Sequence, residues 1–323
     1  MQRRSFLASA GALGLPKLAT AQTGPFPNQP IKWIVPYPAG GGTDALARTI
    51  AEALRAPLGQ PFLIDNKPGA ATNIAGEMVA KSKADGYTVM SADNAILTFN
   101  EHLFKKLPFN PEKDFSYIGA MGRFPLILVA HPSFPANNVQ EFVEYVGRNP
   151  GKVDYASPGI GTPHHISMEL IKNRAKLFMT HIAYRGQAPA MTDVMGGQIP
   201  VMFFDTPSGM QHILAGKVKA LGVGATKRLP QLPQVPTLTE GGIKDADVFV
   251  FQGLLGPAGL HEDVLGRLNS ELNKVAETPT VKKRFADLLI EPIPGTPVQF
   301  KQMARSYSAL WGQVIRANNI ELD

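Results

Sequence analysis

Short apolar runs alternate with amphipathic segments between residues 31 and 91. The runs Ile31–Val35, Phe62–Asp65 and Tyr87–Ser91 have the length and composition of strands. Between them, Asp44–Leu54 and Thr72–Ala80 repeat apolar residues at helical spacing. Repeated β-α-β units of this size predict an α/β fold with a parallel sheet and helices on its faces.

The same alternation continues to the end of the chain. Further strands are predicted at Ile127–Val129, Val153–Ala156, Phe178–Ile182 and Val201–Phe204. Further helices are predicted at Val139–Val146, Pro163–Lys172, Glu262–Ala276, Val281–Leu289 and Val298–Ala317. In the last helix, Trp311 falls on the apolar face and is predicted to be a core or docking anchor rather than a ligand contact.

Four Thr-Pro pairs predict helix starts, with threonine as the N-cap and proline at the first helical position. They are Thr162-Pro163, Thr206-Pro207, Thr278-Pro279 and Thr296-Pro297. The composition also changes near Gly119–Pro125 and again near Gly242–Gly256. Two such crossings predict two lobes, residues 22–120 plus 250–323 and residues 121–249, with a hinge and a cleft. Periodicity alone leaves one large doubly wound sheet open.

The N-terminus has the features of an export signal. Arg3 and Arg4 precede an apolar run, Phe6–Leu15, that is too short to span a bilayer. The paired arginines resemble a twin-arginine signal, and Ala19-Thr20-Ala21 has the small-x-small pattern of a cleavage site. We therefore expect residues 1–21 to be removed and the remainder to be periplasmic. An ordinary basic arm is the alternative.

Composition excludes several classes of function. The formal net charge is +6, without dense blocks of lysine or arginine, which argues against a nucleic-acid partner. The absence of cysteine excludes disulfides, thiol nucleophiles and cysteine-ligated metals. No cofactor motif is present, so neither a cofactor nor a metal is expected.

The strongest chemical signal is the glycine-rich turn between the first strand and the first helix. Gly40, Gly41 and Gly42 allow the backbone to approach a ligand closely, and Thr43 is predicted to cap the helix. Because no lysine or arginine occurs from Pro36 to Thr43, an anion bound here would rely on backbone amides at the helix N-terminus. The turn matches neither common nucleotide-binding motif. A turn that only packs is the alternative.

Similar turns follow other strands. Asn66–Asn73 again exposes backbone beside small residues, with Thr72 or Asn73 as the cap, and Ser157–Pro163 is a third strand-to-helix turn. Asp205 ends a strand, where it can bind a ligand amine or hydroxyl, or cap the next helix, which is the safer interpretation. Arg185 can reach a distal carboxylate or remain solvated.

The histidines raise the alternative of an enzyme. His164 and His165 open a helix, and Glu169 lies one turn later, but the zinc-binding H-E-x-x-H spacing is absent. The G-x-S-x-G elbow of serine hydrolases is also absent. The histidines are therefore interpreted as surface or cleft-lining residues.

The turns together resemble the Bug family, the solute-binding receptors of tripartite tricarboxylate transporters. The likeness rests on I-V-P-Y-P-A-G-G-G-T-D-A-L-A-R (Ile34–Arg48), N-K-P-G-A-A-T-N-I-A (Asn66–Ala75), A-D-G-Y-T (Ala84–Thr88), Y-A-S-P-G-I-G-T (Tyr155–Thr162), Y-R-G (Tyr184–Gly186), V-M-G-G-Q-I (Val194–Ile199) and L-P-Q-V-P-T (Leu232–Thr237). It covers essentially the whole chain after the signal.

The resemblance implies a type II periplasmic-binding-protein fold, in which two lobes, each a mostly parallel sheet flanked by helices, close over a ligand. The family's ligand contacts, carried over position by position, are Tyr37, Ala39, Gly40, Gly41, Thr43, Gly69, Ala70, Thr72, Asn73, Ser157, Gly159, Thr162, Tyr184 and Asp205. It also implies a monomeric, non-catalytic receptor that delivers a small organic carboxylate to membrane transport subunits. A periplasmic enzyme acting on a small acid and a sensory partner of a membrane protein are the alternatives.

The sequence leaves the ligand open between di- or tricarboxylates and aromatic acids. Tyr37, Tyr184, Phe203 and Phe204 can stack on an aromatic acid or belong to the core of a lobe.

Overall fold

Ten strands form one connected sheet in the computed structural model, which describes residues 25–322. The strands are β1 (Ile31–Val35), β2 (Phe62–Asn66), β3 (Thr88–Asp93), β4 (Phe115–Ala130), β5 (Asp154–Ser157), β6 (Thr180–Ala183), β7 (Val201–Asp205), β8 (Lys219–Val223), β9 (Phe249–Pro257) and β10 (Glu291–Pro292). The main order is β2-β1-β3-β9-β4-β7-β5-β6, and both β8 and β10 pair with β4.

Helices follow most of these strands. They are α1 (Gly42–Leu58), η1 (Ala70–Thr72), α2 (Asn73–Ala80), η2 (Ala95–Phe99), α3 (Asn100–Leu103), α4 (Val139–Arg148), α5 (Pro163–Ala175), α6 (Gln187–Met195), α7 (Thr206–Leu214), α8 (Glu262–Ala276), α9 (Pro279–Leu288) and α10 (Pro297–Ala317). No helix within residues 25–322 is long and apolar enough to cross a membrane.

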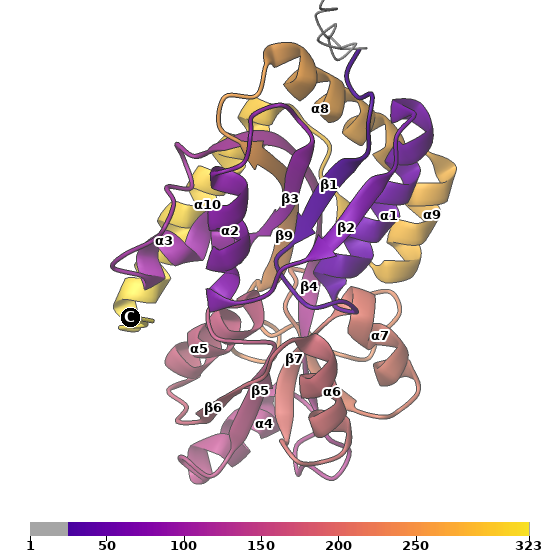
Figure 1. The fold of residues 1–323 in the computed structure, drawn as a ribbon. Coiled ribbons are helices and arrows are strands. Elements are labelled where there is room, and N and C mark those ends of the chain that lie inside the picture. Colours follow the sequence, from indigo (N-terminus) through magenta and orange to yellow (C-terminus); the bar gives the residue numbers. More distant parts are fainter. Residues whose placement is uncertain (1–24, 323) are drawn as a thin grey trace, which may run out of the picture.

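The long strand β4 joins the two lobes. Its residues 115–125 pair with β9, whereas its residues 126–130 pair with β7. Figure 1 shows the result as an upper lobe around β1, β3 and β9 and a lower lobe around β5, β6 and β7, with β4 passing between them. The two-lobed α/β fold predicted from the sequence is confirmed.

The sheet is mostly parallel within each lobe, as predicted, and is antiparallel where the chain crosses between the lobes. β1 is parallel to β2 and β3, and β5 is parallel to β6 and β7. β4 and β9 instead run antiparallel to their neighbours. In the upper lobe β9 runs against β3 and β4, and in the lower lobe β4 runs against β7 and β8, because these strands carry the chain between the lobes.

Both faces of each sheet are buried. In β1, Trp33 packs into the cluster beneath α1, whereas the adjacent Ile34 packs on the opposite face with residues of α2 and α10. In β7, Phe203 and Phe204 likewise enter different clusters and are fully buried. Strands covered on both faces are largely apolar, and here only Lys32 and the terminal Asp205 are charged. Phe203 and Phe204 therefore belong to the core of the lower lobe.

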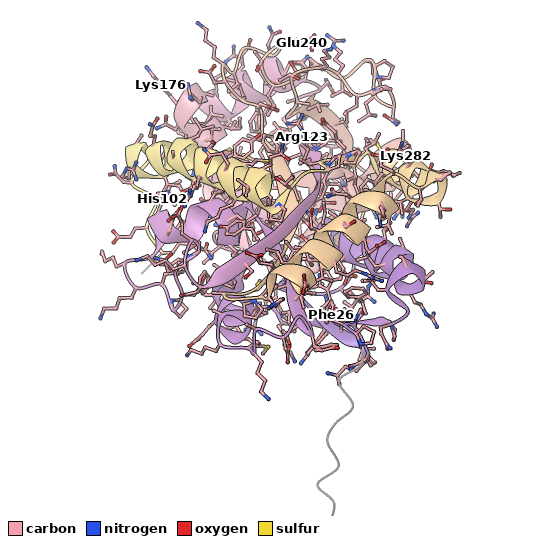
Figure 2. All side chains as sticks on the ribbon, turned by 90° about the horizontal axis from the view of Figure 1, so that it is seen from above. Phe26, His102, Arg123, Lys176, Glu240 and Lys282 are labelled. Carbon is pink, nitrogen blue, oxygen red and sulfur yellow. The ribbon has the colours of Figure 1, made fainter. Side chains whose placement is uncertain are left out.

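Helix α10, close to the C-terminal end of the chain, lies on the upper lobe. Trp311 is 4% exposed, and its ring lies 5.1 Å from that of Phe99, edge to face, which confirms it as a core anchor. Figure 2 shows His102 beside this helix, where its Nε2 lies 2.8 Å from the hydroxyl of Ser308.

Most sequence-predicted elements are present, with ends displaced by a few residues. The N-caps Thr162, Thr278 and Thr296 are confirmed by hydrogen bonds from backbone amides. Thr206 is not a cap: Asp205 accepts from the Ser208 amide at 2.9 Å, so α7 begins one residue earlier than predicted. The predicted signal peptide lies outside the described residues.

Candidate functional site

Loops from both lobes meet around one cleft. Its outer part has a volume of about 620 Å³, within the size range of small-molecule sites. It is lined by Pro36, Tyr37, Pro38, Pro68, Gly69, Ala70, Ala71, Thr72, Pro158, Gly159, Ile160, Thr162, Ala183, Tyr184, Arg185 and Gly186. A smaller inner part is lined by Tyr37, Pro38, Gly41, Gly42, Thr43, Asp93, Phe124, Pro158, Thr162, Pro163, His164, Gln187 and Val250.

The turn between β1 and α1 is held from its own lobe. The Tyr37 hydroxyl donates to Asp93 at 2.7 Å, and the Tyr37 carbonyl accepts from Asn66 at 2.8 Å. Asp44 accepts from the Gly40 amide, from Asn66 and from Arg48. Burial opposes ionisation of Asp44, but these donors lower its pKa overall. An ionised carboxylate thus joins this turn to strand β2.

Thr43 does not cap α1, contrary to prediction. The N-cap is Gly41, which has no side chain that could accept a hydrogen bond, and Thr43 lies inside the first turn. Its hydroxyl instead accepts from the Gln252 amide at 2.6 Å. The N-terminus of α1 therefore keeps backbone amides that its own residues do not cap.

The turn between β2 and α2 has an unusual backbone. Gly69, Ala70, Ala71 and Thr72 all have positive φ, from 46° to 134°. For the three non-glycine residues this conformation costs about 1 kcal/mol or more each, so surrounding contacts must maintain it. The buried Asn100 side-chain amide supplies these contacts. It donates to the Ala71 carbonyl at 2.8 Å, and it also lies within hydrogen-bond distance of the side-chain oxygens of Thr72 and Asn73. Thr72 occupies the N-cap position of α2 without forming a cap hydrogen bond.

In the lower lobe, a stack of two histidines supports the turn between β5 and α5. The rings of His165 and His181 lie 4.0 Å apart and nearly parallel. His165 Nδ1 accepts from the Gly161 amide at 3.2 Å, and His181 Nε2 lies 2.6 Å from the Ser157 hydroxyl. Burial lowers the pKa of His165 to about 4 and that of His181 to about 3, so both rings are neutral near pH 7.

Asp205 links the two lobes. One carboxylate oxygen caps α7, and the other accepts from the Gly42 amide of α1 at 3.3 Å. His164 Nε2 lies 3.7 Å from the same oxygen. Burial opposes ionisation, but His164 and Ser208 lower the pKa of Asp205 overall. A carboxylate of the lower lobe therefore already lies at the N-terminus of α1. This is the position where a ligand anion was predicted from the sequence.

The structure places nine of the fourteen predicted site residues on the cleft wall. These are Tyr37, Gly41, Thr43, Gly69, Ala70, Thr72, Gly159, Thr162 and Tyr184. Ala39 and Gly40 are exposed outside it, Asn73 and Ser157 are buried behind it, and Asp205 contacts its wall through Gly42 and His164. Direct ligand contacts by these residues stay a prediction.

Three polar residues of the inner part, Asp93, His164 and Gln187, are not among the ligand-binding residues predicted from the sequence. Asp93 ends β3, as Asp205 ends β7, and could have been found by extending the predicted strand from Ser91. His164 was interpreted only as surface or cleft lining. Gln187 begins α6 directly after Gly186, but no local pattern distinguishes it from an ordinary helix start.

Asp93 makes stability depend on pH. Burial is the main cause that raises its pKa to about 6, against the hydrogen bond from Tyr37. The folded state therefore binds more protons than the unfolded state between about pH 4 and pH 6, so the free energy of unfolding falls as pH rises through this range. In Asp93→Asn this contribution, on the order of 3 kcal/mol, is expected to disappear. Urea unfolding of both proteins from pH 4 to pH 8 measures it, and identical slopes would contradict the assignment.

Comparisons with known proteins identify the family and agree with the fold. Residues 46–320 match the family described as the tripartite tricarboxylate transporter family receptor. Protein BugT of Bordetella pertussis is 30% identical over 318 residues, covering 98% of this chain and 96% of its own. Rhodopseudomonas palustris Rpa4515, solved with adipate, has a TM-score of 0.89 and 28% identity, covering 92% of this chain and 100% of its own. MatC of the same organism, solved with bound malate, has a TM-score of 0.86 and 29% identity, covering 90% and 100%. The chain belongs to the Bug family of tripartite tricarboxylate transporter receptors.

Proposed function

We propose that the protein is an extracytoplasmic receptor that captures a small organic carboxylate between its two lobes and delivers it to the membrane subunits of a tripartite tricarboxylate transporter. The observation that carries this proposal is the convergence of strand-to-helix turns from both lobes on one cleft of about 620 Å³. In open α/β sheets, ligands bind at the carboxyl ends of strands, where these turns lie.

Backbone amides are the proposed donors of the hydrogen bonds that hold the ligand carboxylate. The outer cleft is bordered by Gly69–Thr72 and Gly159, where glycine and left-handed backbone bring main-chain atoms to the surface. Arg185, exposed at its edge, is the one lysine or arginine among the described residues that line the outer or inner part. The adipate and malate bound by the two R. palustris relatives support a carboxylate ligand.

The remaining expectations belong to the same proposal. Residues 1–21 direct export to the periplasm, residues 22–120 and 250–323 form the first lobe, and residues 121–249 form the second. The receptor acts as a monomer without catalysis, cofactor or metal. His164 beside Asp205 keeps the enzyme alternative testable, because a histidine paired with a carboxylate is a common acid–base arrangement.

A panel of mono-, di- and tricarboxylates and aromatic acids, monitored by thermal unfolding and calorimetry, tests this function. A ligand that binds only the folded state, supplied at 100 times its Kd, adds about 2.7 kcal/mol of stability. We expect such stabilisation with at least one acid, and no loss of that acid from solution by chromatography. Failure of every acid to bind would refute the receptor; consumption of the acid, abolished by His164→Phe, would favour an enzyme.

Neutralising Lys67 is expected to change affinity less than twofold. Its ammonium lies 3.1 Å from Asp65, and Lys67 is absent from the cleft lining. Calorimetry of Lys67→Met against the parent protein measures this. A tenfold loss would mean that a cationic side chain, not the backbone of the turn, holds the carboxylate.

A further inference from the structure

Two polar side chains at the inner end of the cleft lack hydrogen-bond partners among the described residues. Both ring nitrogens of His164 and both amide atoms of Gln187 lack a hydrogen bond, although the residues are only 8% and 6% exposed; His164 Nε2 has only the 3.7 Å contact with Asp205. Leaving a buried polar group unpaired costs about 1–3 kcal/mol. His164 from α5 and Gln187 from α6 both line the inner pocket, so a group bound there can satisfy them.

The charges around this pocket disfavour a second ligand carboxylate. Asp93 lines the pocket, and Asp205 lies 3.7 Å from His164 Nε2. No lysine or arginine lies among the described residues that line it. A ligand carboxylate here would add a third acidic group to a buried site whose only nearby base is one histidine, and like charges in low dielectric repel strongly.

The backbone amide at the start of α1, beside the pocket, already has an acceptor. The Gly42 amide at the start of α1 already donates to Asp205. The inner pocket has a volume of about 30 Å³, which suits one or two water-sized atoms better than a planar carboxylate. The outer part, by contrast, has the larger volume, the backbone of residues 69–72 and the neighbouring Arg185.

We propose that the ligand is a carboxylic acid whose other end carries a single hydrogen-bond donor without negative charge, either a hydroxyl or an ammonium group. The carboxylate lies in the outer part, and the donor enters the inner pocket between Gln187 and His164. A hydroxyl donates to Gln187 Oε1 and accepts from His164 or the Gln187 amide, whereas an ammonium group donates to Gln187 and to Asp93. This inference rests on the proposed receptor function. The ligand that it describes differs from adipate, with which Rpa4515 was solved.

Matched acids test the proposal. Butanoate, 4-hydroxybutanoate, 4-aminobutanoate and butanedioate have the same chain length and differ only at the far end, and equivalent sets with five and six carbons cover other spacings. By calorimetry we expect one donor-bearing acid to bind at least tenfold tighter than both the plain acid and the dicarboxylate of its length. The hydroxy and amino acids distinguish the two donors. Tighter binding of a dicarboxylate would overturn this inference but preserve the receptor, whereas binding of no acid would remove the receptor function itself.

Variants place the donor in the pocket. Gln187→Met keeps length and volume but removes both polar atoms, and is expected to lower the preference for the donor-bearing over the plain acid at least fivefold. His164→Phe provides a second variant that keeps a flat ring. The control is Gln140→Met, at an exposed position of α4. An unchanged preference in the folded Gln187 or His164 variant would overturn the placement.

Discussion

Gly42→Val is expected to lower affinity for the bound acid at least 100-fold while each lobe stays folded. A Cβ on Gly42 would lie 3.0 Å from both Cγ and Oδ2 of Asp205 in the opposite lobe, and 3.0 Å from the Phe124 ring on the connecting strand β4. These distances are shorter than ordinary contacts, and the added methyl groups of valine extend further. The side chain therefore forces the lobes apart and separates the turns that must converge on the ligand.

Calorimetric affinity and urea unfolding together measure this effect. Gly266→Val is the matched control, because Gly266 is also helical, in α8, and its added Cβ has no neighbour within 4 Å. It adds the same side chain to a helical glycine without touching the cleft. If folded Gly42→Val binds within threefold of the parent protein, contact between the lobes at Gly42 is not needed for capture.

Asp205→Ala is expected to lower the free energy of unfolding by about 2–4 kcal/mol. Removing an N-cap costs roughly 0.5–2 kcal/mol, and leaving a buried polar group without its acceptor costs about 1–3 kcal/mol more. Asp205 fulfils both roles, since it caps α7 at the Ser208 amide and lies 3.7 Å from His164. It also accepts from Gly42 across the lobes.

Asp205→Asn separates these roles. Its amide oxygen can still accept from Ser208, so the cap survives and the expected loss is about 1 kcal/mol. Urea unfolding of both variants at pH 7 gives the comparison. Equal losses in the alanine and asparagine variants would show that the charge, and not the cap, accounts for the role of Asp205 in stability.

Local patterns predicted the turns of the cleft well. Gly40–Gly42, Gly69 and Gly159 were recognisable because glycine permits backbone that other residues avoid, and strand ends mark the binding edge of an open sheet. Two of the predicted caps are wrong. Thr43 and Thr206 have the right residue type for a cap. However, the Thr43 hydroxyl accepts a hydrogen bond from the distant Gln252, and the preceding Asp205 caps α7.

The inner pocket could not be predicted in the same way. Asp93, His164 and Gln187 come from three helices and strands far apart in sequence, and they meet only because β4 and β9 bring the lobes together. Strand β9, apolar except for Gln252, also lay within a region interpreted only as a domain boundary, because a strand buried on both faces shows no alternation. Whether a polar side chain lacks a partner is a property of packing and cannot be read from spacing.

Hydrogen exchange with and without the tightest-binding acid of the four-to-six-carbon sets tests the central claim most directly. If the acid is held by main-chain amides between the lobes, exchange slows together in residues 37–45 and 68–75 of the upper lobe and residues 157–164 of the lower lobe. Helix α4, which lies away from the cleft lining, should not change. Saturating binding that protects the turns of only one lobe, or none of them, would contradict capture between the lobes.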